Sequence, residues 1–248
     1  MDSDRVTRIS LLNVPLDILK PEDFDDVIRS MFSDGRNHQI VLLSLWDLLR
    51  ARRNGEFRTM VNGASLVVPI SRSLVRGARF LRREEPVRYM PFDFVIRLLN
   101  ALERWNRSVY LLGSTRRNLG LAEENIHATY PGVRIVGRFP GHYPKHLEQS
   151  ILQAIRKSTP TLLLVGRGVL GRERWIPRSL KHFNSGLYLW CSDLFDVFAE
   201  KAPKPSRALF DRGLEWIPYT LRRPWKILRF LSYLRYRLLL LWYRIRRR

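Results

Sequence analysis

The chain has 248 residues, of which 45% are apolar, and a formal net charge of +21. This length and apolar content suffice for one sizeable core, and the excess of Lys and Arg favours a polyanionic partner, either nucleic acid or an anionic membrane surface. The single cysteine, Cys191, excludes an internal disulfide and a cysteine-based zinc site. The first residues lack the basic-then-apolar order of a signal peptide, and no run reaches the roughly 18 apolar residues that a membrane-spanning helix needs.

Strand-like and helix-like segments alternate along the chain. The predicted strands are one or two over 9–18 around a turn at 13–15, followed by strands over 39–45, 65–69, 108–112, 133–136, 161–165 and 186–191. The predicted helices lie over 21–31, 48–61, 92–105, 144–157 and 194–199, the last being short. A further helix is capped by Ser114 and ends near 130. The basic stretch 71–83 has no clear assignment. This alternation predicts an α/β fold, with a mostly parallel sheet and helices on both faces.

A glycine turn follows the apolar strand predicted over 161–165, where Gly166 and Gly168 break the strand and Glu173 begins a helical pattern. Open α/β sheets build ligand sites at such turns, because the turn lies at the carboxyl edge and the helix offers free N–H groups. Arg167 and Arg172 flank the turn and are suited to bind a diphosphate. The competing interpretation is a plain tight turn with solvent-exposed arginines.

The C-terminal region, 204–248, is predicted to be a basic helical appendage to an α/β domain over 1–203. Ile227, Leu231, Leu234, Leu238, Leu241 and Ile245 recur at spacings of three and four and form one stripe of a helix. The residues expected to contact a membrane are Arg222, Arg223, Lys226, Arg229, Arg235, Arg237, Trp242 and Arg244. This pattern predicts a helix lying in an anionic membrane interface, with packing on the sheet or on a partner as the alternative. A nucleic-acid partner is disfavoured, because the basic residues are concentrated in one terminal helix rather than spread over a recognition surface.

Several short segments resemble, in order and spacing, the WecG/TagA/CpsF glycosyltransferases (glycosyltransferase family 26). They lie at 13–17, 61–69, 88–93, 109–113, 130–137, 141–143, 163–176, 195–196 and 213–216. The resemblance implies a Rossmann-like fold and a peripheral protein at the cytoplasmic face of the bacterial inner membrane. It implies inverting transfer, without metal or cofactor, from a UDP-sugar to a polyprenyl-diphosphate-linked acceptor in polysaccharide or exopolysaccharide biosynthesis. Substrate-binding residues expected on this basis and from the turn are Ser44, Arg88, Gly113, Gly166, Arg167, Gly168, Arg172, Glu173, Arg207 and Arg212.

The chain departs from the family pattern at the end of the strand predicted over 65–69. The family carries Asp-Gly there, with the Asp as its proposed catalytic base, whereas this sequence has Ile70 and Ser71. An isoleucine cannot accept a proton from a sugar hydroxyl. Either another carboxylate serves as base, with Asp93 and Asp193 as candidates, or the protein is an inactive homologue that binds a glycan or another glycosyltransferase as a subunit.

Overall fold

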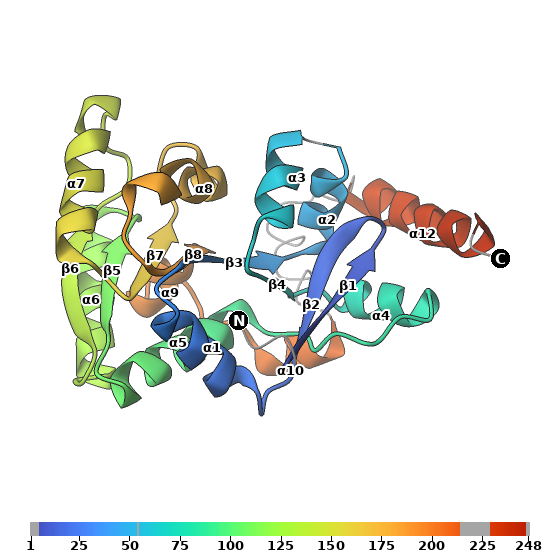
Figure 1. The fold of residues 1–248 in the computed structure, drawn as a ribbon, viewed down its shortest axis with the longest axis horizontal. Coiled ribbons are helices and arrows are strands. Elements are labelled where there is room, and N and C mark those ends of the chain that lie inside the picture. The colour runs from blue at the N-terminus through green and yellow to red at the C-terminus, as the bar shows by residue number, and fades with distance from the viewer. Residues whose placement is uncertain (1–4, 54, 214–228, 247–248) are drawn as a thin grey trace.

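A six-stranded parallel sheet forms the centre of the protein (Figure 1). The computed structural model describes residues 5–53, 55–213 and 229–246. The strand order is β4-β3-β8-β7-β5-β6. The strands are β3 (Asn37–Leu43), β4 (Leu66–Pro69), β5 (Ser108–Leu112), β6 (Arg134–Phe139), β7 (Leu162–Gly166) and β8 (Gly186–Ser192). This arrangement confirms the predicted Rossmann-like α/β fold.

Alternate residues of the strands enter different hydrophobic clusters, as a sheet buried on both faces requires. On β7, for example, Leu162 and Leu164 pack on one face while Leu163 and Val165 pack on the other. The first face is covered by α1 (Phe24–Ser33), α5 (Pro91–Arg104), α6 (Arg116–Thr129) and α9 (Leu194–Phe198). The opposite face is covered by α2 (Leu45–Ala51), α3 (Gly55–Asn62), α7 (Glu148–Ser158) and α8 (Trp175–Ser179).

An antiparallel hairpin of β1 (Val6–Leu11) and β2 (Val14–Leu19) lies beside the β4 edge of the sheet (Figure 1). The buried carboxylate of Asp17 fixes this hairpin. It accepts two hydrogen bonds from Arg8, at 2.7 and 2.8 Å, and one from the backbone N–H of Val67, at 2.6 Å. The hairpin therefore protects the edge strand and is tied to it by a charged group rather than by further strand pairing.

Three local predictions need correction, and one unassigned stretch proves to be helical. The helix predicted over 48–61 is two helices, α2 and α3, and a capping box of Ser44 and Asp47 begins α2 at Leu45, before the predicted start. The unassigned stretch 71–83 contains α4 (Arg72–Phe80). Thr115 rather than Ser114 caps α6, and the helix predicted over 144–157 starts as a 3₁₀ turn, Lys145–Leu147, before α7.

The C-terminal part contains α10 (Arg207–Arg212) and the long α12 (Arg229–Arg246). One face of α12 packs on the body, where the Tyr236 hydroxyl donates to the Ser73 carbonyl at 2.8 Å and Leu240 is buried. Gly77 of α4 makes room for this contact, since a Cβ there would lie 2.0 Å from the Tyr236 hydroxyl. Within the described ranges, no helix has both the length and the apolar content to cross a membrane.

Candidate functional site at the carboxyl edge of the sheet

At the carboxyl edge of the sheet, neighbouring strands lead to helices on opposite faces, and we call the strand ends at β3–β8 and at β7–β5 the two crevices of this edge. The chain leaves β3 and β7 toward α2 and α8 on one face, and leaves β8 and β5 toward α9 and α6 on the other. Ligands of open α/β sheets bind where neighbouring strands diverge in this way. The predicted site residues Ser44, Gly113, Gly166, Arg167 and Asp193 all lie at or directly after these strand ends.

Glycines let the loops at the β7–β5 crevice pack backbone against backbone. A Cβ on Gly113, whose φ is +134°, would lie 2.8 Å from the backbone of Gly166. The same loops are joined by hydrogen bonds from Ser114 N–H to the Arg167 carbonyl (2.6 Å) and from His142 N–H to the Gly168 carbonyl (2.7 Å). The glycine turn therefore holds the edge together, and these N–H groups are engaged by neighbouring loops.

The segment after the glycine turn is not the helix with free N–H groups that the sequence predicted. Arg167 N–H donates to the Ser192 carbonyl at 2.9 Å, and the segment after the turn is a three-residue 3₁₀ helix, Arg172–Arg174, followed by the five-residue α8. Elements this short have a weak dipole compared with a long helix. The turn therefore supplies side-chain charge, from Arg167 and Arg172, more than a helix dipole.

Asp196 orients the groups beside this turn. Its Oδ1 accepts from the Ser114 hydroxyl and the Asn118 amide, both at 2.8 Å, and its Oδ2 accepts from Arg167 at 2.9 Å. Arg167 also lies 3.4 Å from Asp193, and its side chain is 58% exposed. The guanidinium is thus held over the edge by two carboxylates while one side remains open to solvent.

Glu173 links the two crevices, because it is paired with Arg50 of α2 and lies 3.9 Å from Arg172. A second link joins Glu56 of α3 to Arg174 at 2.9 Å and to Arg178 at 2.7 Å. These ion pairs connect the α2–α3 layer to the α8 layer across the intervening strand β8.

The sequence interpretation missed Asp47, which lies one helical turn beyond β3. The Ser44 hydroxyl and the Ser44 N–H both donate to Asp47 Oδ2, at 2.5 and 3.1 Å. Burial raises the pKa of Asp47, and Glu173 raises it further, although the bonds from Ser44 oppose this. The Ser-x-x-Asp spacing of a capping box was the signal that could have found this residue.

Other predicted site residues lie around the same edge. Arg88 stacks on the Phe210 ring of α10, with 3.6 Å between the guanidinium carbon and the ring centroid, and donates to the Phe210 carbonyl. Asp93 is half-buried in the first turn of α5, and Arg207 and Arg212 are exposed on α10. Arg222, Arg223 and Lys226 lie outside the described residues.

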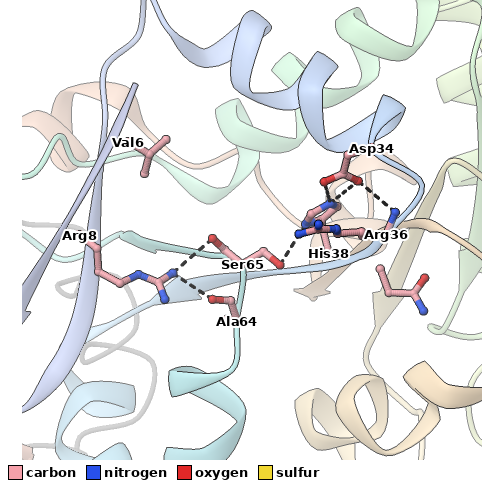
Figure 2. A pocket seen from close by; sticks show the side chains of 8 residues that line it. Val6, Arg8, Asp34, Arg36, His38, Ala64 and Ser65 are labelled. Atoms are coloured by element: carbon pink, nitrogen blue, oxygen red, sulfur yellow. Dashed lines mark hydrogen bonds and ion pairs between the residues drawn. The ribbon is translucent and has the colours of Figure 1, made fainter. Parts of the chain in front are cut away.

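A cavity of about 540 Å³ lies at the opposite, amino edge of the sheet (Figure 2). It contains His38, which lies 2.8 Å from both carboxylate oxygens of Asp34 through Nε2 and 3.1 Å from the Ser65 hydroxyl through Nδ1. These bonds tie the end of α1 to the starts of β3 and β4. Across the described ranges, no three His, Cys, Asp or Glu side chains converge in a way that would hold a metal ion.

Comparison with known proteins identifies the family of the chain. The model of the Glycosyl transferase WecG/TagA/CpsF family matches residues 9–248. The chain belongs to this family. The match spans both the sheet and α12, so the C-terminal helix is part of the WecG/TagA/CpsF homology rather than an unrelated extension.

Relatives within the WecG/TagA/CpsF family carry a specific enzymatic name, N-acetylglucosaminyldiphosphoundecaprenol N-acetyl-beta-D-mannosaminyltransferase. One from Bacillus spizizenii is 22% identical over 186 residues, which cover 75% of this chain and 72% of the relative. One from Bacillus subtilis is 20% identical over 191 residues, covering 77% and 74%. One from Staphylococcus aureus is 20% identical over 233 residues, covering 91% and 88%. This glycosyltransferase family membership agrees with the resemblance noted in the sequence.

Proposed function

We propose that this chain transfers a sugar, with inversion, from a UDP-sugar to a polyprenyl-diphosphate-linked acceptor at the surface of a membrane. The reaction belongs to the assembly of a bacterial cell-surface polysaccharide or exopolysaccharide, at the cytoplasmic face of the inner membrane. Family membership and the names of the relatives support the reaction class and the lipid-linked acceptor. Residues 1–203 supply most of the site, and residues 204–248 supply membrane attachment and two further arginines of the site, Arg207 and Arg212.

The two apolar faces of α12 carry this proposal. Its docked face is formed by Tyr236, Leu240 and their partly buried neighbours. On the opposite face the apolar side chains are exposed, and they are Leu231, Leu234, Leu238, Leu241, Trp242 and Ile245. Leu231 is 63% exposed and Ile245 is 66% exposed. A contiguous apolar stripe of this kind marks an interaction surface, and the polyprenyl acceptor places a lipid bilayer within reach of it.

Arginines border this exposed stripe on both sides. At about 100° per residue, Arg235 and Arg246 lie on one side of it and Arg237 on the other. Arg244, which was also expected to contact the membrane, instead donates to the Phe80 carbonyl at 2.9 Å and stacks on the Phe80 ring of α4. Long basic side chains at the edges of an apolar stripe reach the lipid headgroups while the stripe enters the acyl boundary. Each contributes about 1 kcal/mol near an anionic leaflet. This geometry favours a bilayer over a partner protein with a neutral surface.

The carboxyl edge supplies charge for a nucleotide diphosphate. Arg167 and Arg172 have side chains that are 58% and 77% exposed, and Arg207 and Arg212 on α10 are also open to solvent. In the proposed reaction these guanidiniums bind the diphosphate and balance the charge that develops on UDP as it departs. Ser44, directly after β3, and Glu173, which follows β7 and pairs with Arg50, contact the sugar or ribose hydroxyls.

The alternative function is a catalytically inactive subunit that binds a glycan or another glycosyltransferase. The observation that favours it is the aliphatic Ile70 directly after β4, where the family pattern has its acid. In that case, the sheet and the membrane helix serve binding only.

Calorimetry with UDP and with UDP-N-acetylmannosamine, followed by turnover on a short polyprenyl-diphosphate N-acetylglucosamine, separates the two functions. The enzyme binds the nucleotide and forms the disaccharide product, and Arg167→Gln weakens nucleotide binding. Failure of the full-length protein to bind either nucleotide would leave only the subunit function.

Vesicle flotation tests the membrane attachment. The triple substitution Leu234→Asn, Leu238→Asn and Leu241→Asn should abolish flotation with anionic vesicles, because it removes the apolar stripe without changing charge. Arg235→Gln with Arg237→Gln should weaken flotation in proportion to the anionic lipid content. If the triple variant floats like the parent chain, α12 does not insert its stripe and the membrane proposal fails.

A further inference from the structure

We propose that Asp47 is the general base of the transfer reaction, taking the place of the acid that the family pattern has at the position of Ile70. This assignment rests on the proposed glycosyltransferase function. It differs from the sequence interpretation, in which Asp93 and Asp193 were the candidates. Three observations support it: the position of Asp47 beside the β4 end, the solvation of its carboxylate, and the engagement of the competing carboxylates.

The first observation is that Asp47 lies next to the loop that contains Ile70. Ile70 N–H donates to the Leu43 carbonyl at 3.0 Å, and Leu45 N–H donates to the Ser71 hydroxyl at 3.1 Å. The end of β4 is thereby bonded to the residues that begin α2. Asp47 is in the first turn of α2, and it therefore follows closely on the residues that are bonded to the loop containing Ile70.

The second observation concerns the two oxygens of the Asp47 carboxylate. All hydrogen bonds that it accepts from the described part of the chain reach Oδ2, and both come from Ser44. Oδ1 is therefore available to a substrate hydroxyl. Partial desolvation makes a carboxylate more basic, which improves proton transfer from a sugar hydroxyl. Asp47 combines this environment with a fixed rotamer, because its Oδ2 is held by two donors.

The third observation is that neighbouring carboxylates are engaged by cations or donors. Asp196 accepts three hydrogen bonds, and Asp193 lies 3.4 Å from Arg167 with a side chain that is 58% exposed. Glu173 is paired with Arg50. Asp93 lies in the first turn of α5, on the other face of the sheet from α2. Asp93 also has no ion pair within the described structure, and Tyr89 N–H joins the segment before it to the Pro69 carbonyl of β4 at 3.1 Å, so Asp47 differs from Asp93 by lying on the α2 face of the sheet.

The proposed step balances as a single displacement. Asp47 Oδ1 takes the proton of the acceptor hydroxyl while the acceptor oxygen forms its bond to the anomeric carbon. The bond from that carbon to the phosphate oxygen breaks, and its electron pair leaves with UDP. The carboxyl group then returns its proton to solvent. Ser44 acts as a positioning residue, since its N–H and O–H hold Oδ2 and direct Oδ1 toward the acceptor.

Asp47→Asn tests this assignment in the full-length protein, because an asparagine carbonyl keeps the capping bonds while losing basicity. We expect nucleotide binding within about twofold of the parent chain and turnover lower by about 10²–10⁴-fold. The acid limb of the pH profile of kcat/KM should disappear. Asp47→Glu should restore part of the turnover, which a purely structural cap would not predict. Asp93→Asn and Asp193→Asn test the two competing carboxylates and should change turnover far less.

The outcomes of these experiments distinguish failure of the Asp47 assignment from failure of the proposed glycosyltransferase function. If the parent chain turns over and Asp47→Asn stays within about threefold of it, the base is another group and only this inference is overturned. If Asp93→Asn or Asp193→Asn shows the large loss instead, the assignment passes to that residue. If the parent chain shows no turnover, the proposed enzymatic function is overturned and the role of Asp47 falls with it.

Discussion

The two edges of the sheet use polar residues in different ways. At the amino edge, Asp17 is bonded by Arg8 and by a backbone N–H, and His38 bridges Asp34 and Ser65 (Figure 2). At the carboxyl edge, Arg172 is 77% exposed and Asp47 is bonded through one oxygen only. The charged groups of the amino edge join the hairpin and the strands to one another. At the carboxyl edge, charged groups are held in place but keep donors or acceptors that no other group of the described structure uses. This difference supports the proposal that the chemistry takes place at the carboxyl edge.

The largest expected effect is at the amino edge, in Asp17→Ala. The substitution leaves Arg8 without its partner and the buried Val67 N–H without an acceptor. The expected loss is about 3 kcal/mol of unfolding free energy, measured by urea denaturation. The matched change at the carboxyl edge, Asp193→Ala, should cost less than about 0.5 kcal/mol, because that side chain is exposed. Equal losses at the two positions would contradict the contrast between the edges.

Gly113→Ala should give the next largest effect, since it tests the packed half of the carboxyl edge. The new Cβ would lie 2.8 Å from the Gly166 backbone at a φ of +134°, so the loops must separate. We expect a loss of about 2 kcal/mol in unfolding free energy, with weaker nucleotide binding. Gly55→Ala is the control, because no atom lies within 4 Å of its added Cβ and it should be neutral. If Gly113→Ala leaves the unfolding free energy and nucleotide binding unchanged, the close contact between the two loops is not required.

The fold was predictable because its signals are local. Buried parallel strands are short apolar runs, as in β5 and β7; Gly113 follows β5 and Gly166 is the last residue of β7. The exposed stripe of α12 was also predictable from its spacing. The opposite, docked face of α12 was not, because Tyr236 and Leu240 pack against α4, a basic helix that buries only Leu74, Gly77 and Ala78 and therefore has no apolar run to indicate it.

The candidate site was predictable in position but not in partners. The strand-end turn indicated Arg167, and the family resemblance indicated Ser44 and Asp193; all three lie at the carboxyl edge because parallel strands present their carboxyl ends there. The pairing of Glu173 with Arg50 joins segments far apart in sequence, and no local pattern indicates it. Asp47 was missed because the helix was expected to begin at 48, which placed the residue in a loop instead of a capping box.

A smaller effect is expected in the pH dependence of stability, with opposite signs at the two edges. Burial opposes ionisation of Asp34, but hydrogen bonds from His38 and Arg36 N–H outweigh it and lower its pKa from 3.8. Its contribution to stability is therefore present above the unfolded pKa and lost as the pH falls through the lower folded pKa. Asp34→Asn should flatten this acid limb in urea denaturation at a series of pH values.

Asp47 should show the reverse dependence, because burial raises its pKa. The folded state binds that proton more tightly, so its contribution is present at low pH and lost as the pH rises through the folded pKa. Asp47→Asn should therefore gain stability relative to the parent chain as the pH increases toward neutrality. The same sign for Asp34→Asn and Asp47→Asn would remove the contrast between a structural and a functional edge.

The smallest expected effect is in Arg50→Gln, which changes the surroundings of Asp47 without touching it. Arg50 is 38% exposed, so loss of its pair with Glu173 should cost less than about 1 kcal/mol of stability. Removing this cation and freeing the charge of Glu173 should raise the pKa of Asp47 further, since Arg50 lowers it and Glu173 raises it. The acid limb of kcat/KM should move to higher pH. Glu56→Gln is the matched control, because it breaks the pairs with Arg174 and Arg178 across the same layers but leaves the neighbours of Asp47 in place. If both variants shift the pH profile equally, the shift reflects the joining of the two layers and not the charge that Asp47 experiences.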